Sequence, residues 1–253
     1  MGFARDAISV DKFLGGRLML MQPRKGYRAG VDPVFLAASV SAHPGESVLE
    51  LGCGAGAAIL ALGSRVADLR LVGVEKQSAY AELARRNAFD NDIDLDVFQA
   101  DLNNLPPEVR EESFDHVIMN PPYHLRLNGS RAPDAGREAS LGEDTPLVDW
   151  IKAATKRLKP RGYLTMIQKA ERLPEILASL DDRMGSVLVK PLCPREGRAA
   201  VLVLVHARKG GRGAFRLAAP LILHDGAEHV GDAESYRQEV SAILRDGVAL
   251  PLW

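Results

Sequence analysis

The residues with the clearest chemical potential form the sequence Asn-Pro-Pro-Tyr, at Asn120, Pro121, Pro122 and Tyr123. They follow residues 114–119, a short apolar run that predicts a buried strand. Proline fixes φ at about −65° and has no N–H, so such a turn holds its carbonyl groups in set directions. The Asn120 side-chain oxygen and the Pro121 carbonyl then offer two acceptors beside a flat ring. This arrangement suits a planar group that carries an NH2, such as an adenine amine or a carboxamide, although a simple tight turn has the same composition.

A second candidate site is the glycine-rich segment of residues 48–56, which runs from a predicted strand into a predicted helix. Its glycines, Gly52, Gly54 and Gly56, let the backbone turn sharply and approach a ligand closely. The helix that follows offers free N–H groups at its N-terminus. The G-x-G-x-x-G spacing of dinucleotide dehydrogenases is met only loosely. The alternating glycines after Glu50 fit a different cofactor better, and Cys53 between them is expected only to be small.

Polar side chains also stand at the ends of neighbouring predicted strands. Glu75 ends one strand, where its carboxylate can accept both hydroxyls of a ribose, and Asp101 follows the next, placed to accept from an adenine amine. In an open parallel sheet, ligands bind outside the carboxyl ends of the strands. We therefore expect Glu75, Asp101 and Asn120 to meet at one site, with the adjacent Lys76 and Leu102 beside the same cofactor.

The elements that must position these residues alternate between strands and helices, which is the pattern of a parallel α/β sheet. The predicted strands are residues 47–51, 69–75, 95–100, 114–120, 162–168, 186–191 and 199–206. The predicted helices are residues 57–67, 78–89, 147–158 and 172–180. Little sequence separates the last two strands, which favours an antiparallel pair, because a parallel return needs about a dozen residues or more. The expected fold class is α/β, a seven-stranded, mostly parallel sheet with an antiparallel last strand in a three-layer α/β/α arrangement.

Three parts are expected along the chain: an N-terminal extension at 1–46, a catalytic domain at 47–208 and a C-terminal appendage at 209–253. The extension holds a strand or hairpin at 14–22 and a helix at 32–41, with Asp32 as its N-cap and Pro33 at its first position. The appendage holds a helix at 233–245. Residues 124–145 form a long polar loop, and loops of that length in a compact domain are usually functional.

Composition restricts the class of protein. The chain has 253 residues, of which 46% are hydrophobic and 26% charged, enough for a buried core. No apolar run approaches the ~20 residues of a membrane span, and no secretory leader is recognisable, so a cytoplasmic protein without a membrane partner is expected. Two distant cysteines predict neither a disulfide framework nor a metal site. The net charge is −1, but two basic runs, at 152–161 and 206–216, lead to the hypothesis that they hold an RNA backbone.

The glycine segment, Glu75, Asp101 and the Asn-Pro-Pro-Tyr turn, in this order, resemble the class I S-adenosylmethionine-dependent methyltransferases, which implies a Rossmann-like fold. The turn is similar to that of amino-methyltransferases. More narrowly, the chain resembles the tRNA1(Val) adenine-N6 methyltransferase family, also in residues 26–32 and 194–198. The resemblance implies that Glu50 and the glycines lie beside the methionine part of S-adenosylmethionine, with Arg28 and Asp32 near the same end.

The expected activity is methyl transfer to an exocyclic amine, most directly adenine N6 in tRNA, with Tyr123 stacked on the target ring. No metal is expected, and the oligomeric state is left open. Three alternatives remain: methylation of a ribosomal RNA base, methylation of a protein glutamine, and a non-catalytic module that binds the cofactor or RNA. Glutamine methyltransferases usually carry a separate N-terminal helical domain, for which only about 45 residues precede the first predicted strand here.

Overall fold

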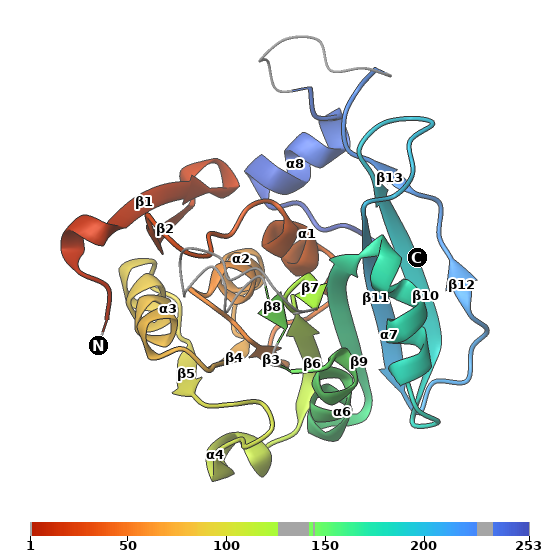
Figure 1. The fold of residues 1–253 in the computed structure, drawn as a ribbon, viewed down its shortest axis with the longest axis horizontal. Coiled ribbons are helices and arrows are strands. Elements are labelled where there is room, and N and C mark those ends of the chain that lie inside the picture. Colours follow the sequence, from red (N-terminus) through yellow and green to blue (C-terminus); the bar gives the residue numbers. More distant parts are fainter. Residues whose placement is uncertain (1, 126–141, 144, 227–234, 253) are drawn as a thin grey trace.

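A computed structural model of the chain describes residues 2–125, 142–143, 145–226 and 235–252. Within these residues the centre is a nine-stranded sheet in the order β12-β10-β11-β9-β6-β3-β4-β5, with β13 also paired to β10 (Figure 1). The strands are β3 (Ser47–Leu51), β4 (Arg70–Glu75), β5 (Asp96–Gln99), β6 (Phe114–Met119), β9 (Leu158–Lys169), β10 (Met184–Cys193), β11 (Leu202–Lys209), β12 (Arg216–Leu217) and β13 (Leu221–Ile222).

The strand directions confirm the predicted fold class. Strands β3, β4, β5, β6 and β9 run parallel, whereas β11 is antiparallel to both β9 and β10. The link between β10 and β11 is too short for a parallel crossover, as the sequence indicated. The two-residue strands β12 and β13 extend the predicted seven strands at one edge.

Helices cover both faces of the sheet, because successive strand residues point to opposite sides. On β6, Ile118 belongs to the core under one helical layer, while Val117 and Met119 belong to the core under the other. The first layer holds α1 (Asp32–Ala38), α2 (Ala57–Arg65), α3 (Ser78–Asp90) and α8 (Gln238–Asp246). The second holds α4 (Pro107–Arg110), α6 (Leu147–Arg157) and α7 (Leu173–Ser179). This is the expected three-layer arrangement.

One predicted helix cap and one predicted helix start were wrong. Val31, not Asp32, occupies the N-cap position of α1, so Asp32 is the first helical residue and its carboxylate is free for a tertiary contact. The C-terminal helix begins at Gln238, because Tyr236 forms a β-bridge with His224 instead of a helical turn. Positions 233–234 of that predicted helix, and most of the predicted loop at 124–145, lie outside the described residues. The described parts of that loop include the short paired strands β7 (His124–Leu125) and β8 (Gly142–Glu143).

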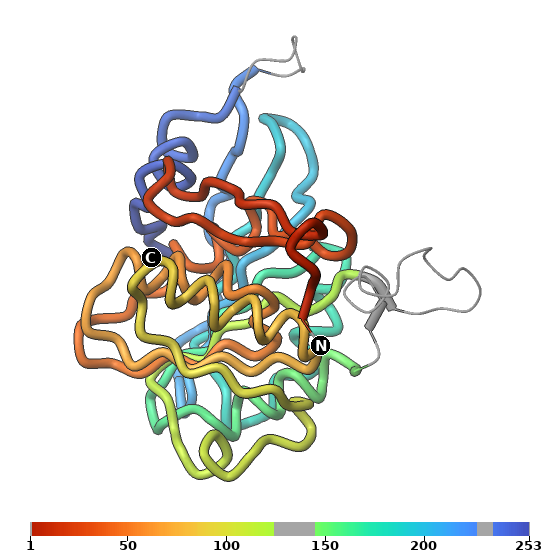
Figure 2. Tube along the Cα trace, turned by 90° about the vertical axis from the view of Figure 1, so that its left-hand side faces the viewer, coloured from red at the N-terminus to blue at the C-terminus, as the bar shows by residue number. Residues whose placement is uncertain are grey.

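The N-terminal residues form a hairpin of β1 (Ile8–Phe13) and β2 (Leu18–Pro23), which lies beside α8 and across α3 (Figure 2). Asn87 of α3 is fully buried and binds the backbone of β2, accepting from the Met21 N–H at 2.7 Å and donating to the Met21 carbonyl at 3.0 Å. Its amide also donates to the Ala55 carbonyl at 2.9 Å. The hairpin is therefore tied through one side chain to the glycine-rich loop that precedes α2.

The two basic runs lie at the edge of the sheet where the parallel strands begin. Lys159 Nζ is 2.7 Å from Asp115 Oδ2, at the start of β6. Lys209 Nζ donates to the carbonyl of Leu158, the first residue of β9, at 2.6 Å. Because β11 is antiparallel, its carboxyl end reaches this same edge. Both runs are thus remote from the carboxyl ends of the strands, and several of their cations are engaged within the protein.

No helix within the described residues has the length and apolar character that a membrane span requires.

A buried histidine on β11 makes the stability of the fold sensitive to acid. His206 lies with Nδ1 3.0 Å from Thr165 Oγ1 and its ring 4.8 Å from the Tyr163 ring. Burial, with a smaller contribution from His116, lowers the pKa of His206 from 6.5 to about 4. Because the unfolded chain regains the ordinary pKa, it takes up this proton more readily than the folded chain between these two values.

We expect the free energy of unfolding to be highest, as far as His206 is concerned, above pH 6.5 and to decrease as the pH falls towards 4. A pKa shift of this size lowers the free energy of unfolding by about 3 kcal/mol once His206 is protonated in both states. His206→Gln should therefore lose less stability than the wild type between pH 7 and pH 4 in urea titrations. The exposed His43 provides the control, since His43→Gln should follow the wild type. Equal losses in the wild type and His206→Gln would contradict the assignment.

Candidate active site

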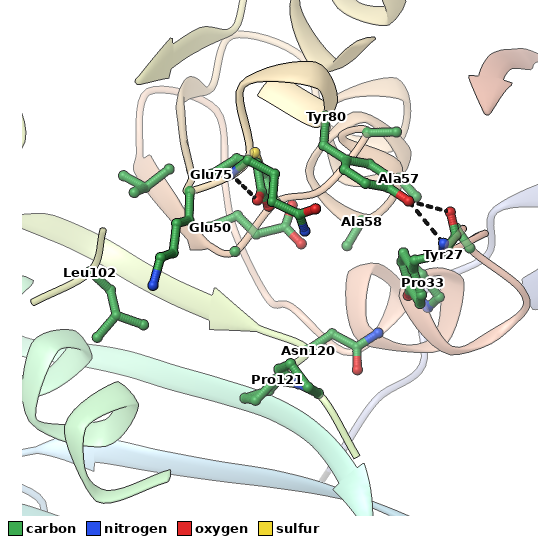
Figure 3. A pocket seen from close by; sticks show the side chains of 18 of the residues that line it. Tyr27, Pro33, Glu50, Ala57, Ala58, Glu75, Tyr80, Leu102, Asn120 and Pro121 are labelled. Carbon is green, nitrogen blue, oxygen red and sulfur yellow. Dashed lines mark hydrogen bonds between the residues drawn. The ribbon is translucent and has the colours of Figure 1, made fainter. Parts of the chain in front are cut away.

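A cavity of about 290 Å³ opens at the carboxyl ends of the parallel strands. Figure 3 shows that its walls come from the segment before α1, the loop after β3, the end of β4 and the turn after β6. Of the residues singled out from the sequence, it is lined by Arg28, Asp32, Glu50, Gly52, Cys53, Glu75, Lys76, Asp101, Leu102, Asn120, Pro121, Pro122 and Tyr123. Gly54 and Gly56 belong to the same loop but are not part of the cavity wall.

The three glycines of the loop after β3 all have positive φ, which favours glycine. Gly52 has φ 68°, and a Cβ there would lie 2.6 Å from the Trp150 ring of α6. Gly54 has φ 55°, and a Cβ there would meet no atom within 4 Å, so the space beside it is open. Gly56, with φ 88°, immediately precedes α2. Cys53 is buried with its Sγ against Gly73, where a larger side chain would collide with β4.

Glu75, at the end of β4, holds the glycine loop by its carboxylate. Its Oε2 accepts from the Gly54 N–H at 2.9 Å and its Oε1 accepts from the Gln77 N–H at 2.8 Å. Burial raises the pKa of Glu75, and these backbone donors oppose the rise. Lys76 contributes a third backbone donor, so three of the roughly four lone-pair sites of the carboxylate are used and one remains for a ligand. Its predicted contact with two ribose hydroxyls stays a prediction.

Glu50 is the second buried carboxylate of the cavity. Its side chain is 3% exposed, and Oε2 accepts from the Ile59 N–H of α2 at 3.0 Å. Burial raises the pKa of Glu50 well above its usual range; the Ile59 bond lowers it and the neighbouring Glu75 raises it further. Two partly desolvated carboxylates on adjacent strands favour a positively charged ligand in the cavity that they line.

Asp101 and Lys76 are paired at the wall formed after β4 and β5. Lys76 Nζ lies 2.9 Å from Asp101 Oδ2, and the Asn103 N–H donates to Asp101 Oδ1 at 2.9 Å. The Asn103 hydrogen bond and the Lys76 ammonium lower the pKa of Asp101. Leu102 supplies an apolar surface next to this pair. The predicted bond from an adenine amine to Asp101 would share an oxygen that already accepts from the protein.

The turn after β6 presents Asn120 and Pro121 to the cavity, with the Asn120 side chain directed inwards (Figure 3). The Pro121 carbonyl accepts a hydrogen bond from Gln168 Nε2 at 3.2 Å, and the Pro122 carbonyl accepts from the same atom at 3.4 Å. A carbonyl oxygen has two lone pairs, so Pro121 keeps one for a ligand. Asn120 and Pro121 thus both lie at the cavity wall, and their role as a pair of acceptors stays a prediction.

The Tyr123 ring is fixed on both its edge and its face. Its hydroxyl donates to Asp32 Oδ2, which joins the turn to the first residue of α1. Burial, followed by the charge of Asp32, raises the pKa of Tyr123, so the hydroxyl stays protonated. Lys169 Nζ lies 5.5 Å from the centre of the ring, within the range of a cation–π contact. Asp32 therefore contacts the turn, and its predicted contact with a cofactor stays a prediction.

Arg28 lines the cavity, but its guanidinium points to the N-terminal hairpin. Nη1 donates to Ser9 Oγ at 2.7 Å and to the Pro23 carbonyl at 2.8 Å, and Nη2 lies 2.5 Å from Asp11 Oδ2. In this arrangement Arg28 ties the segment before α1 to the hairpin. Its predicted proximity to the methionine end of a cofactor stays a prediction.

Several lining residues were missed from the sequence. Tyr27 N–H donates to the Tyr80 hydroxyl at 2.8 Å, which in turn donates to the Tyr27 carbonyl at 3.1 Å. Gln22, from β2, accepts from the Ala29 N–H at 2.7 Å. Tyr27 is the sequence neighbour of Arg28, which was predicted to lie near the cofactor, so this position could have been included in the predicted site. Trp150 carries no such signal, because it reaches the cavity from a helix far along the chain.

The cavity fits S-adenosylmethionine by the chemistry of its walls. Gly52 and Cys53 bring the glycine loop to the cavity wall, and the buried Glu50 and Glu75 favour the positive charges of the sulfonium and ammonium groups. Tyr80, Leu102 and Ala100 add apolar surface for a flat ring. These features, on a sheet of this topology, define a class I methyltransferase.

Comparison with known proteins supports the assignment to the methyltransferases. Residues 30–189 match the model of the methyltransferase small domain. The chain is 31% identical, over 66% of its length, to 68% of "tRNA1(Val) (adenine(37)-N6)-methyltransferase" of Porphyromonas gingivalis. It is 29% identical, over 65% of its length, to 43% of "Ribosomal RNA small subunit methyltransferase C" of Salmonella arizonae. A solved structure described as a predicted O-methyltransferase, protein Atu636 from Agrobacterium tumefaciens, superposes with a TM-score of 0.70 at 29% identity, covering 87% of this chain and 98% of that one.

The chain belongs to the methyltransferase small domain family and is an S-adenosylmethionine-dependent methyltransferase.

Proposed function

We propose that this enzyme methylates the exocyclic N6 amine of an adenine in a transfer RNA. The observation that carries the proposal is that Asn120 and Pro121 line the same cavity as the glycine loop and Glu75. In this proposal the two residues form an NH2-accepting pair beside the space for the cofactor. The tRNA assignment is supported by the similarity to the tRNA1(Val) (adenine(37)-N6)-methyltransferase of Porphyromonas gingivalis.

The acceptors of the turn address the weakness of an exocyclic amine as a nucleophile, whose lone pair is delocalised into the ring. Asn120 and the Pro121 carbonyl accept the two N–H bonds, which favours a pyramidal nitrogen with its lone pair directed at the cofactor. S-adenosylmethionine supplies a methyl group made electrophilic by its positively charged sulfur. The fixed dipoles of Asn120 and Pro121 stabilise the positive charge that develops on the nitrogen. The extra proton leaves the methylated nitrogen afterwards to solvent.

The target base must leave its stack before it enters the cavity. Tyr123 is only half-buried, and its bond to Asp32 holds the ring plane in place for stacking on that base. Stacking of this kind contributes about 1–3 kcal/mol per base. Lys169 Nζ, over the same ring, is a positive charge that a phosphate of the RNA could contact.

The test is transfer of labelled methyl groups from S-adenosylmethionine to separate pools of tRNA, ribosomal RNA and protein, from cells that lack the gene. We expect the label in tRNA, and N6-methyladenosine in its nucleosides by mass spectrometry. Label in ribosomal RNA or in protein glutamine would replace the proposed substrate with one of those alternatives. Binding of S-adenosylmethionine without transfer to any pool would favour a non-catalytic module.

A further inference from the structure

Gln168 lies behind the Asn-Pro-Pro-Tyr turn and does not line the cavity. It is the second-last residue of β9, which pairs with β6 on one side and with β11 on the other. Its exposed fraction is 0%. Met119 of β6 is opposite Met166, so Gln168 stands level with Pro121, where the chain leaves the sheet.

The orientation of the Gln168 amide follows from its neighbours. The Lys169 N–H donates to Gln168 Oε1 at 2.8 Å, and an N–H requires an acceptor at that position. Nε2 must then face the Pro121 and Pro122 carbonyls, which lie 3.2 and 3.4 Å away and also require a donor. The reverse orientation would set two carbonyl oxygens against a third, so only one arrangement satisfies all the groups.

This contact occupies one side of the Pro121 carbonyl. The prolines have no N–H, so the turn cannot continue the ladder of hydrogen bonds with its own donors. The prolines restrict the turn but supply no donor, so without Gln168 the buried Pro121 carbonyl would lack a partner and could shift through its ψ angle towards another donor. With Gln168 on one lone pair, the remaining lone pair has a fixed direction.

We propose that Gln168 is a positioning residue that aims the Pro121 carbonyl at the acceptor NH2 of the substrate. This inference rests on the proposed function, because it assumes that Pro121 accepts from that group. Gln168 touches neither the substrate nor the cofactor. It therefore acts on the rate of transfer and not on cofactor affinity.

The test uses Gln168→Glu, because a carboxyl can donate to Pro121 only when it is protonated. Burial raises the pKa of a carboxyl by up to about 3–5 units, so the variant should change form between about pH 9 and pH 6. We expect its single-turnover rate of methyl transfer to fall roughly 10- to 100-fold below wild type at the alkaline end. The rate should approach the wild-type rate at the acid end, where the protonated carboxyl replaces the amide donor.

Two further variants distinguish orientation of the Pro121 carbonyl by Gln168 from a general contribution of Gln168 to the stability of the fold. Gln168→Leu has no donor in either form and should be slow at every pH. Thr165→Val removes a buried side-chain hydrogen bond from the same strand without touching the turn, and should keep the wild-type pH profile. Thermal melts and the S-adenosylmethionine dissociation constant, measured at each pH, should show that the variants are folded and bind the cofactor. If Gln168→Glu does not fold at alkaline pH, Gln168→Leu at neutral pH carries the test.

The assay uses whichever pool of tRNA, ribosomal RNA or protein accepts label from the wild type, because the argument applies to any NH2 group. Label in another pool than tRNA thus changes the proposed substrate and leaves this test intact. Wild-type rates in both Gln168 variants, or losses without a pH-dependent recovery in a folded Gln168→Glu, would overturn the positioning role alone. Transfer by the wild type to none of the pools would overturn both proposals.

Discussion

Replacement of Asn120 by alanine is expected to slow methyl transfer by about 10²–10³-fold, the usual effect of removing one group that stabilises a transition state. The side chain is directed into the cavity and forms, with the Pro121 carbonyl, the proposed pair of acceptors for the NH2 group. Its loss leaves one N–H of the substrate without a partner as positive charge develops on the nitrogen. The dissociation constant of S-adenosylmethionine should change little, because Glu50, Glu75 and the glycine loop remain.

Asn120→Asp is the matched variant, since it preserves the size of the side chain and an acceptor oxygen. It should retain more activity than Asn120→Ala, because the carboxylate still accepts from the amine. Single-turnover rates with labelled S-adenosylmethionine separate transfer from binding. A near wild-type rate in Asn120→Ala would show that the acceptor role is wrong.

Replacement of Glu75 by alanine should raise the dissociation constant of S-adenosylmethionine by about 10- to 100-fold, as expected for the loss of charge-assisted hydrogen bonds. Two effects combine in this variant. The proposed acceptor for the ribose hydroxyls disappears, and the Gly54 and Gln77 N–H groups lose the carboxylate that holds them. Calorimetry gives the dissociation constant directly.

An analogue of the cofactor that lacks one ribose hydroxyl separates these two effects. In the wild type it should bind more weakly than S-adenosylmethionine, whereas in Glu75→Ala the difference should vanish, because the partner of that hydroxyl is absent. Glu82→Ala, at an exposed position on α3, is the control and should bind both compounds like the wild type. An unchanged dissociation constant in Glu75→Ala would remove the ribose assignment.

Local sequence was sufficient for the sheet and for the principal lining residues of the cavity. The strand β6 and the turn after it were predicted because an apolar run followed by Asn-Pro-Pro-Tyr restricts its own backbone. The glycines before α2 were predicted for the same reason, since the backbone there requires positive φ. The carboxyl ends of parallel strands meet at one edge, so Glu75, Asp101 and Asn120 could be placed at one site without coordinates.

Contacts between distant segments were not predictable in this way. Asp32 fits the pattern of a helix cap, yet its carboxylate accepts from Tyr123, and Arg28 is held by the hairpin. Strand direction places Lys159 and Lys209 of the basic runs at the edge opposite the cavity, and contact of these runs with RNA stays a prediction. Gln168 carries no local signal, because its role depends on the register between β9 and β6.

Sequence alone determined the class of this protein, because backbone restriction by proline and glycine and the periodicity of apolar residues act over a few neighbouring positions. Only the tertiary structure decided which donor meets which acceptor. A side chain such as Gln168 or Asp32 finds its partner through the packing of strands and helices, and many pairings satisfy the same local pattern. The physical reason is that hydrogen bonds are short and directional, so the partners of these side chains are fixed only when the whole sheet has assembled.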